Sequence, residues 1–249
     1  ANTTGWSNIA VGRDALSHNT VSEKNVAVGQ NALRENTDGQ YGVALGHDAL
    51  QQNTTGDGNT ALGAFCLDAN TTGIENTSVG YNSLTDNTTG DANTSVGKNA
   101  LMDNTTADNN TGIGFEALKL NTTGTNLVAV GAFALDSNTT ANSNTGVGYA
   151  ALAACTSGNS HVAVGTRALA NVVTNNNCTA VGFDALRYGT GADNTAVGST
   201  ALDANTTGAS NTAVGKGALG SNTTADNNVA VGLNALTANT TGHSNTAIG

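Results

Sequence analysis

The residues able to take part in acid–base or metal chemistry are few, and the sequence keeps them apart. A seventeen-residue repeat runs through the chain, and the four histidines, His18, His47, His161 and His243, occupy four different positions of it. Stacking of repeats brings together only side chains at equivalent positions. The histidines therefore predict neither metal ligation nor acid–base catalysis, and we expect the protein not to be an enzyme.

One set of carboxylates does recur at a single repeat position, beside a turn: Asp57, Asp91, Asp108 and Asp226. Stacked turn carboxylates are compatible with weak Ca²⁺ binding, but the Gly-Gly-x-Gly-x-Asp repeat of calcium β-rolls is absent. The alternative is that these are ordinary solvated turn residues. No other cofactor is predicted.

The element that must position all these residues is the repeat itself. A glycine closes each repeat, from Gly12 to Gly249, at intervals of seventeen residues apart from one of sixteen between Gly182 and Gly198. Self-similarity at a short fixed period is the signature of a solenoid. Strict register argues against the disorder that an Asn-, Thr- and Gly-rich composition otherwise suggests. We expect one repeat domain over residues 1–249, cut from a longer chain because neither end has a polar cap.

The consensus coil is Gly-x-x-Ala-Leu-x-x-Asn-Thr-Thr-Gly-x-x-Asn-Thr-Ala-Val. Thr-Ala-Val alternates as a short strand does, Ala-Leu marks a second strand, and the Gly- and Asn-containing segments supply turns. The sequence thus predicts an all-β parallel solenoid of about fifteen coils with two short strands each. At about 4.8 Å per coil such a rod is roughly 70 Å long.

Two aliphatic columns are predicted to fill the narrow interior. The residue before the closing glycine is always aliphatic (Val79, Val96 and Ile113), and a Leu column is unbroken (Leu84, Leu101 and Leu118). The residues preceding these two columns are small, mostly Ala, Ser or Gly. By strand alternation the small columns lie on the opposite face. There they predict close packing against another surface, and hence lateral self-association; the alternative is an alanine-rich face left in water.

Two asparagine columns are predicted to form structural ladders, as amides do in stacked β-structures. The first begins at Asn2 and includes Asn53, Asn70, Asn87 and Asn104; the second includes Asn59, Asn76, Asn93 and Asn110. The Asn-Thr-Thr sequence in the first column is also an N-glycosylation acceptor. The candidate acceptors are Asn53, Asn70, Asn87, Asn104, Asn121 and Asn138. The Asn-Thr-Thr repeat that supplies the ladder asparagines also contains the acceptor sequence. The default interpretation is therefore that the acceptor sequences occur by coincidence.

The pattern slips in one region. Cys155, Val172 and Gly189 replace three successive members of the first asparagine column, and the short repeat falls in the same region. It is either tolerated drift or a local patch that differs from the rest. Cys66 replaces an Ala and is expected to be a small buried residue. The three cysteines, Cys66, Cys155 and Cys178, are an odd number in three different columns and predict no disulfide framework.

The net charge and the spacing of the basic residues restrict the kinds of partner that the chain is expected to bind. The formal net charge is −10, and eight Lys and Arg residues are scattered along the chain. Nucleic acids and anionic membranes need clustered basic residues, so neither is expected to bind. No apolar run approaches the length that spans a bilayer, and no direct membrane insertion is expected.

The motif Asn-x-Ala-Val-Gly-x-x-Ala-Leu, best seen at 25–29, 126–131 and 228–232, resembles the head repeats of trimeric autotransporter adhesins of the YadA type and related phage-fibre repeats. The resemblance covers essentially the whole chain. It implies a left-handed β-roll, trimerisation, and adhesion to host, matrix or glycan ligands at a cell surface. Two departures are the longer period, with its extra Asn-Thr-Thr-Gly turn, and the absence of a stalk or anchor from this segment.

Function is therefore expected to be structural and adhesive, in a rigid extracellular fibre or spacer. One alternative is ice binding by rows of threonine, such as Thr54/Thr55, Thr71/Thr72 and Thr88/Thr89. Against it, these pairs lie in a predicted turn, where a flat surface is not expected. A second alternative is a carbohydrate-binding fibre of the phage type.

Overall fold

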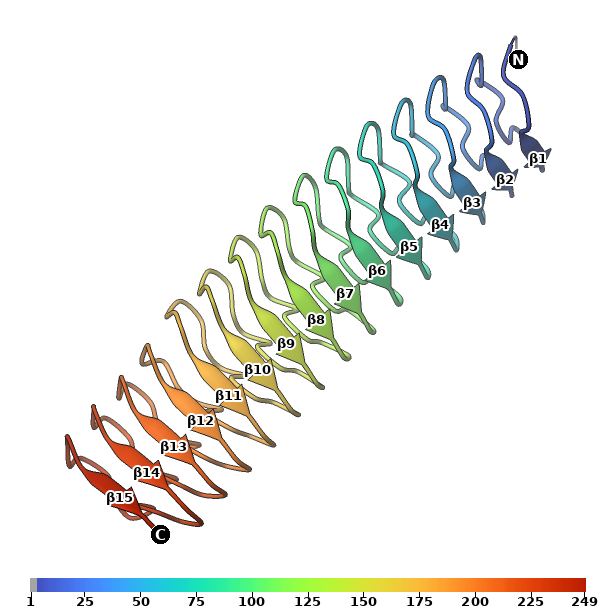
Figure 1. The fold of residues 1–249 in the computed structure, drawn as a ribbon. Coiled ribbons are helices and arrows are strands. Elements are labelled where there is room, and N and C mark those ends of the chain that lie inside the picture. Colours follow the sequence, from blue (N-terminus) through green and yellow to red (C-terminus); the bar gives the residue numbers. More distant parts are fainter. Residues whose placement is uncertain (1–3) are drawn as a thin grey trace. The chain divides into compact units, whose positions relative to one another are not determined.

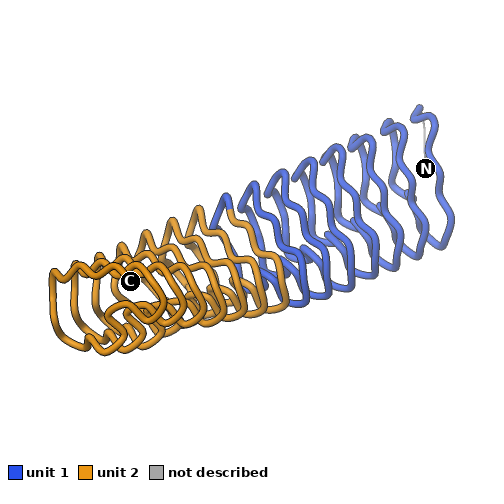
Figure 2. The backbone as a smooth tube through the Cα atoms, turned by 60° about the horizontal axis from the view of Figure 1, so that its bottom comes forward, with its two compact units in different colours: residues 1–126 blue, residues 127–249 orange. Residues whose placement is uncertain are grey.

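The computed structural model describes residues 4–249, which contain fifteen short parallel strands and no helix (Figure 1). The chain divides into two compact units, residues 1–126 and 127–249 (Figure 2). Both units consist of the same repeat, and within each unit successive coils stack as a parallel β-solenoid. The predicted all-β solenoid with a seventeen-residue period is confirmed.

Each strand is three residues long and occupies the same place in its repeat. Unit 1 contains β1 (Ile9–Val11), β2 (Val26–Val28), β3 (Val43–Leu45), β4 (Thr60–Leu62), β5 (Thr77–Val79), β6 (Thr94–Val96) and β7 (Thr111–Ile113). Unit 2 contains β8 (Val128–Val130), β9 (Thr145–Val147), β10 (Val162–Val164), β11 (Thr179–Val181), β12 (Thr195–Val197), β13 (Thr212–Val214), β14 (Val229–Val231) and β15 (Thr246–Ile248).

The register pairs equivalent residues of successive coils. Ser78 of β5 pairs with Ser95 of β6, seventeen residues on. The short repeat does not disturb this register, because Ala180 of β11 still pairs with Ala196 of β12. The missing residue is therefore removed from the turns between these strands.

The strands turn their small residue inward and their large residues outward, which corrects the predicted interior. Ala61 and Ser78, the middle residues of β4 and β5, are fully buried. Of the predicted core residues, Ile113 is 38% exposed, and Val79 and Val96 are partly exposed. Strand alternation places positions one and three of a strand on the same face. The prediction chose the wrong face.

The leucine column explains why only small residues fit inside. Leu84, Leu101 and Leu118 are fully buried, and they lie against the middle residues of the strands. A Cβ atom added at Gly112, in the middle of β7, would lie 3.1 Å from Leu101 Cγ. The interior is thus one leucine thick, and a second aliphatic residue facing it would overpack.

The Ala-Leu segment, predicted as a second strand, is a series of turns. In each coil Leu has a positive φ, for example 53° at Leu84 and 49° at Leu101, a region that L-residues other than Gly enter infrequently. Its backbone still pairs with the neighbouring coil, since the N–H of Leu84 donates to the carbonyl of Ala100 at 3.0 Å. Cross-coil hydrogen bonds satisfy the buried backbone here without strand geometry.

The closing glycine is required by both backbone angle and space. Gly80 has φ +131°, and a Cβ there would lie 2.7 Å from the carbonyl oxygen of Gly97 in the next coil. Any side chain in this column would separate the coils, which explains why the repeat marker is always Gly.

Among residues 4–249, no helix is long and apolar enough to cross a bilayer.

Candidate functional site

The first asparagine column forms a ladder of side-chain amides along the interior. Asn70 Nδ2 donates to Asn53 Oδ1 at 2.8 Å, Asn87 Nδ2 to Asn70 Oδ1 at 2.9 Å, and Asn104 Nδ2 to Asn87 Oδ1 at 3.0 Å. Each Nδ2 also donates to a carbonyl three residues on in its own turn, as Asn70 does to Gly73 at 3.0 Å. The predicted ladder is confirmed; Asn2, at its start, lies outside the described residues.

The second column uses its amides differently. Asn76 Oδ1 accepts the backbone N–H of Asn93 at 3.0 Å, and Asn93 Oδ1 accepts that of Asn110 at 3.0 Å; Asn59 Oδ1 likewise serves Asn76. Asn76 Nδ2 donates to the carbonyl of Gly90 at 2.8 Å. Each of these side chains thus accepts from a buried backbone N–H and donates to a buried carbonyl, which it shares with the first column, as Asn76 shares Gly90 with Asn87.

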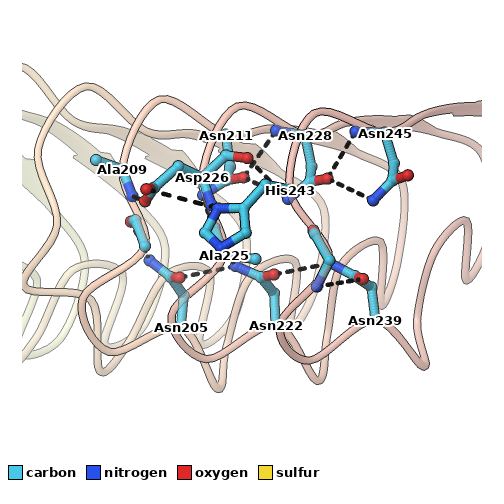
Figure 3. Close-up of polar contacts among 12 residues, drawn as sticks. Asn205, Ala209, Asn211, Asn222, Ala225, Asp226, Asn228, Asn239, His243 and Asn245 are labelled. Atoms are coloured by element: carbon cyan, nitrogen blue, oxygen red, sulfur yellow. Dashed lines mark hydrogen bonds and ion pairs between the residues drawn. The ribbon is translucent and has the colours of Figure 1, made fainter.

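The same two arrangements hold in unit 2, where Figure 3 shows them as parallel rows. Asn222 Nδ2 donates to Asn205 Oδ1 at 3.0 Å, and Asn239 Nδ2 donates to Asn222 Oδ1 at 3.1 Å. The N–H of Asn228 donates to Asn211 Oδ1 at 3.0 Å. These rows hold neighbouring coils in register through hydrogen bonds between buried polar groups.

The ladder corrects the glycosylation hypothesis. The candidate acceptors Asn53, Asn70, Asn87, Asn104, Asn121 and Asn138 are all buried, at 0–1% exposure. A glycan would have to be attached to Nδ2, the atom that donates within the ladder. The sequons are therefore a by-product of the ladder composition, and the folded coil has no room for a sugar there.

In the region where the asparagine columns are interrupted, Cys155, His161 and Cys178 stand at positions that asparagine occupies in other coils. His161, in the second asparagine column, is fully buried. Its Nδ1 accepts the N–H of Cys178 at 3.2 Å, and its Nε2 lies 2.7 Å from the carbonyl oxygen of Asn175. Cys155 and Cys178 are buried free thiols, and burial raises the pKa of Cys155 to about 11. Among residues 4–249, no three His, Cys, Asp or Glu side chains come close enough to hold a metal ion.

The carboxylates of the turn column each bind backbone of the preceding coil. Asp57 Oδ1 accepts the N–H of Gln40 at 2.7 Å, and Asp108 Oδ1 accepts that of Asp91 at 2.8 Å. Asp91 and Asp226 make equivalent contacts. This contact gives the carboxylates a structural role that their spacing in the sequence does not predict. Weak Ca²⁺ binding at this column stays a prediction.

The threonine rows of the turns also have a structural role. The Oγ1 atoms of Thr54, Thr71 and Thr88 donate to the carbonyl oxygens of Thr71, Thr88 and Thr105, respectively, at 2.9–3.1 Å. Their partners Thr55, Thr72 and Thr89 are exposed. Half of each predicted row is therefore engaged with the protein backbone.

The outward face of the strands is the most regular surface of each unit. We call it the strand face: the first and third residues of every strand, which are Thr, Val, Ile or Leu throughout. No strand of either unit carries a charged or aromatic residue on it. Leu45 is 50% exposed and Val162 39%. Most other residues of the strand face are partly exposed. An uncharged row of exposed and partly exposed aliphatic side chains is a candidate interaction surface.

Unit 2 also carries a shallow surface depression of about 330 Å³. It is lined by four alanines and five polar residues: Ala150, Ala153, Ala154, Ala170, Asp136, Ser137, Arg167, Asn171 and Arg187. We call it the alanine depression. A second depression, of about 700 Å³, lies in unit 1, where Glu35 at its edge pairs with His18 at 2.6 Å and with Arg34 at 2.7 Å.

Aromatic rings line up at the turn that follows the strands. In unit 1 the rings of His47 and Phe65 lie 5.3 Å apart and those of Phe65 and Tyr81 lie 5.9 Å apart, edge to face. In unit 2 Phe133 and Tyr149 repeat this contact at 5.9 Å. The sequence analysis missed these rows. The available signal is that Tyr81, Phe115, Tyr149 and Phe183 recur at twice the repeat length.

Comparisons with known proteins add no family. No protein-family model matches the chain, and the search of curated proteins found no significant relative. The ladders, the strand face and the depressions are therefore the features that bear on function.

Proposed function

We propose that the chain is a structural and adhesive module of an extracellular fibre at a cell surface, without catalytic activity, whose copies associate through the strand face. The observation that carries this proposal is the strand face itself. It is uncharged in every coil, whereas the chain as a whole carries a net charge of −10. Two copies can bring these faces together without opposing their like charges, and burying the remaining exposed surface of the aliphatic row is favourable.

Two further features support the structural part of this function. The interior is held by a leucine in each coil and by amide ladders in most coils, so a stiff structure requires no ligand. The resemblance to adhesin heads is consistent with a left-handed roll and a trimer, and both are part of the proposal. The small residues, which first suggested self-association, lie inside; the strand face replaces them as the surface for it.

Oligomeric state tests the proposal directly. The double variant Val79→Glu, Val96→Glu places charge on the strand face of unit 1, and the matched double variant Thr72→Glu, Thr89→Glu places it on exposed turns. In sedimentation velocity we expect the wild type and the turn variant to be oligomers and the strand-face variant to dissociate while keeping the circular dichroism spectrum of the folded wild type. A wild type that is monomeric at every concentration contradicts self-association.

Ice binding is a second candidate, and a different row of threonines supports it better than the turn pairs. Within the described residues the hydroxyls of Thr60, Thr77 and Thr94 have no hydrogen-bond partner in the protein, unlike those of Thr54 and Thr71. They stand in register on a sheet, about 4.8 Å apart, each beside an aliphatic side chain. Thermal hysteresis in the wild type that is lost in Val79→Glu, Val96→Glu would favour this candidate; absence of hysteresis rules it out.

A further inference from the structure

Aromatic side chains recur in every second coil at the position directly after the closing glycine. We call these residues the ring column: His47, Tyr81 and Phe115 in unit 1, and Tyr149 and Phe183 in unit 2. Within each unit the coils between them carry no aromatic residue at this position, but Ala64, Lys98 and Thr166. The tyrosines and phenylalanines of the column are 40–53% exposed. Each unit therefore presents exposed rings at a spacing of two coils.

Contact between the rings of the column does not explain this spacing. Coils stack about 4.8 Å apart, so rings two coils apart are separated by about 9.6 Å. Aromatic pairs interact at centroid separations of about 4.5–7 Å, which rings in successive coils would meet and rings in alternate coils do not. A column that only stabilised the stack would gain more from a ring in every coil. The alternation therefore suits an external ligand whose own repeat has the length of two coils.

Side chains of the intervening coils hold the rings of the column in place. Phe65 contacts His47 and Tyr81 edge to face, with ring centres 5.3 Å and 5.9 Å away. In unit 2 the guanidinium group of Arg167 lies 5.2 Å from the ring centre of Phe183. These contacts restrict the orientations of the rings before any ligand arrives, which lowers the entropic cost of binding.

The charged groups beside the ring column occur in pairs of opposite sign. A carboxylate directly follows three of the five rings, and each contacts a basic side chain: Asp48 with His47 at 3.0 Å, Glu116 with Lys119 at 3.3 Å, and Asp184 with Arg167 at 2.7 Å. These pairs leave little net charge beside the rings, and the net charge of −10 on the whole chain repels a polyanion. Their oxygen and nitrogen atoms can still exchange hydrogen bonds with hydroxyl groups. The surroundings of the rings therefore suit a neutral ligand that is rich in hydroxyls.

An extended β-1,4-linked chain of neutral hexoses has the matching shape. Successive sugars of such a chain are turned over by half a rotation, so the same pyranose face recurs at every second sugar, over a length close to two coil spacings. That face consists mostly of axial C–H groups, which pack on the electron-rich face of an aromatic ring. The hydroxyls project sideways, where polar side chains can bind them. Chains of α-1,4-linked glucose coil and do not keep this linear repeat.

We propose that the ring column of each unit binds an extended, uncharged β-1,4-linked polysaccharide, which lies along the stacking direction of the coils with alternate sugars on the rings. This inference rests on the adhesive part of the proposed function and names its ligand class. Self-association is a separate property, which sedimentation velocity measures on the same variants. Failure of one proposal is therefore distinguishable from failure of the other.

Co-sedimentation with insoluble polysaccharides tests the inference. Cellulose, chitin and β-mannan are the β-1,4-linked probes, and granular starch is the α-linked control. We expect the wild type to be depleted from solution by at least one of the three β-linked polymers and not by starch. A four-ring variant (Tyr81→Ala, Phe115→Ala, Tyr149→Ala and Phe183→Ala) should lose affinity by about five-fold or more. Because these rings are exposed, this variant should keep the circular dichroism spectrum of the folded wild type.

The matched control removes exposed rings outside the column. Tyr41 and Tyr188 are 55% and 44% exposed, one in each unit, and the double variant Tyr41→Ala, Tyr188→Ala should bind like the wild type.

A further variant tests the spacing itself. The double variant Tyr81→Ala, Phe115→Ala leaves only the pair of rings in unit 2 and should keep part of the binding. Adding Thr166→Phe and Phe183→Thr to it leaves the composition of unit 2 unchanged but places its two rings one coil apart. The remaining binding should then fall to that of the four-ring variant.

Four outcomes would overturn the proposal. Depletion by starch equal to that by the β-linked polymers, or an equal loss of binding in Tyr41→Ala, Tyr188→Ala, would reduce the binding to general hydrophobicity. Unchanged binding after the exchange of Thr166 and Phe183 would remove the match of spacings. Absence of depletion by all three β-linked polymers would remove the site, and dissociation of the oligomer in the four-ring variant would then assign the column to contact between copies of the chain.

Discussion

His161 Nδ1 accepts the backbone N–H of Cys178 at 3.2 Å, in the same way that Asn194 Oδ1, at the same repeat position, accepts the N–H of Asn211 at 2.9 Å. The imidazole also reproduces the second contact of the ladder, because Nε2 lies 2.7 Å from the carbonyl oxygen of Asn175. These contacts place the proton on Nε2. A neutral histidine therefore substitutes for asparagine, provided that Nδ1 stays unprotonated.

This substitution predicts a pH-dependent weak point. Burial lowers the pKa of His161 from its ordinary value of 6.5, so the folded state favours the neutral ring. The contribution of the neutral ring is fully present above pH 6.5 and is lost as the pH falls below it, because the unfolded chain takes up the proton first. We expect His161→Asn to remove this loss. Urea unfolding of both proteins at pH 7.5 and pH 5 measures it; an equal fall in both contradicts the assignment.

Asp68 should destabilise the fold at neutral pH. Burial, and then the carboxylates of Asp48 and Asp86, raise the pKa of Asp68 to about 6. A carboxyl with a raised pKa makes the folded state more stable as the pH falls from 6 towards its ordinary 3.8.

Asp68→Asn should therefore increase the free energy of unfolding at pH 8 by about 1–2 kcal/mol, a figure reduced because the group is only half buried. The gain should shrink towards pH 4. Denaturant unfolding across this pH range checks it, and a gain that does not vary with pH would assign the effect to something other than charge.

The orientation of the strands predicts unequal costs for two aliphatic truncations in neighbouring coils. Leu84 is fully buried and Val79 is partly exposed. We expect Leu84→Ala to lower the free energy of unfolding by about 2–5 kcal/mol, as for other buried leucines, and Val79→Ala to cost less than about 1 kcal/mol. Chemical denaturation of the two variants under one condition is the measurement. Equal costs would indicate that the third strand position faces inward after all.

A break in the second asparagine ladder should be costly because it affects two coils. Asn76→Ala leaves the N–H of Asn93 buried without its partner and takes from the carbonyl of Gly90 one of two donors, the other being Asn87 Nδ2. A buried group without a partner costs about 1–3 kcal/mol. The exposed Thr89→Ala, in the neighbouring turn, should change stability by less than about 0.5 kcal/mol. Hydrogen exchange should show lost protection at the amide of Asn93; retained protection there would argue that water or another side chain replaces Asn76.

Much of this fold is determined by the sequence because the repeat is strict. Equivalent residues one repeat apart must stack if the coils are equal in length, so the parallel register and the ladders of Asn70 and Asn76 follow from spacing alone. The closing glycine column likewise follows from close approach of successive coils, as at Gly80 and Gly97.

Only the tertiary structure decided which face of each strand is the inside. Alternation along the strand shows that Thr77 and Val79 share one face and that Ser78 lies on the other. It does not show which of the two faces points into the interior. The decision depends on Leu84 and its equivalents, whose positive φ directs them across an interior too narrow for a second aliphatic row. Local composition predicts neither that backbone angle nor the pairing of Arg167 with Asp184 on neighbouring coils, because both are fixed by packing between coils.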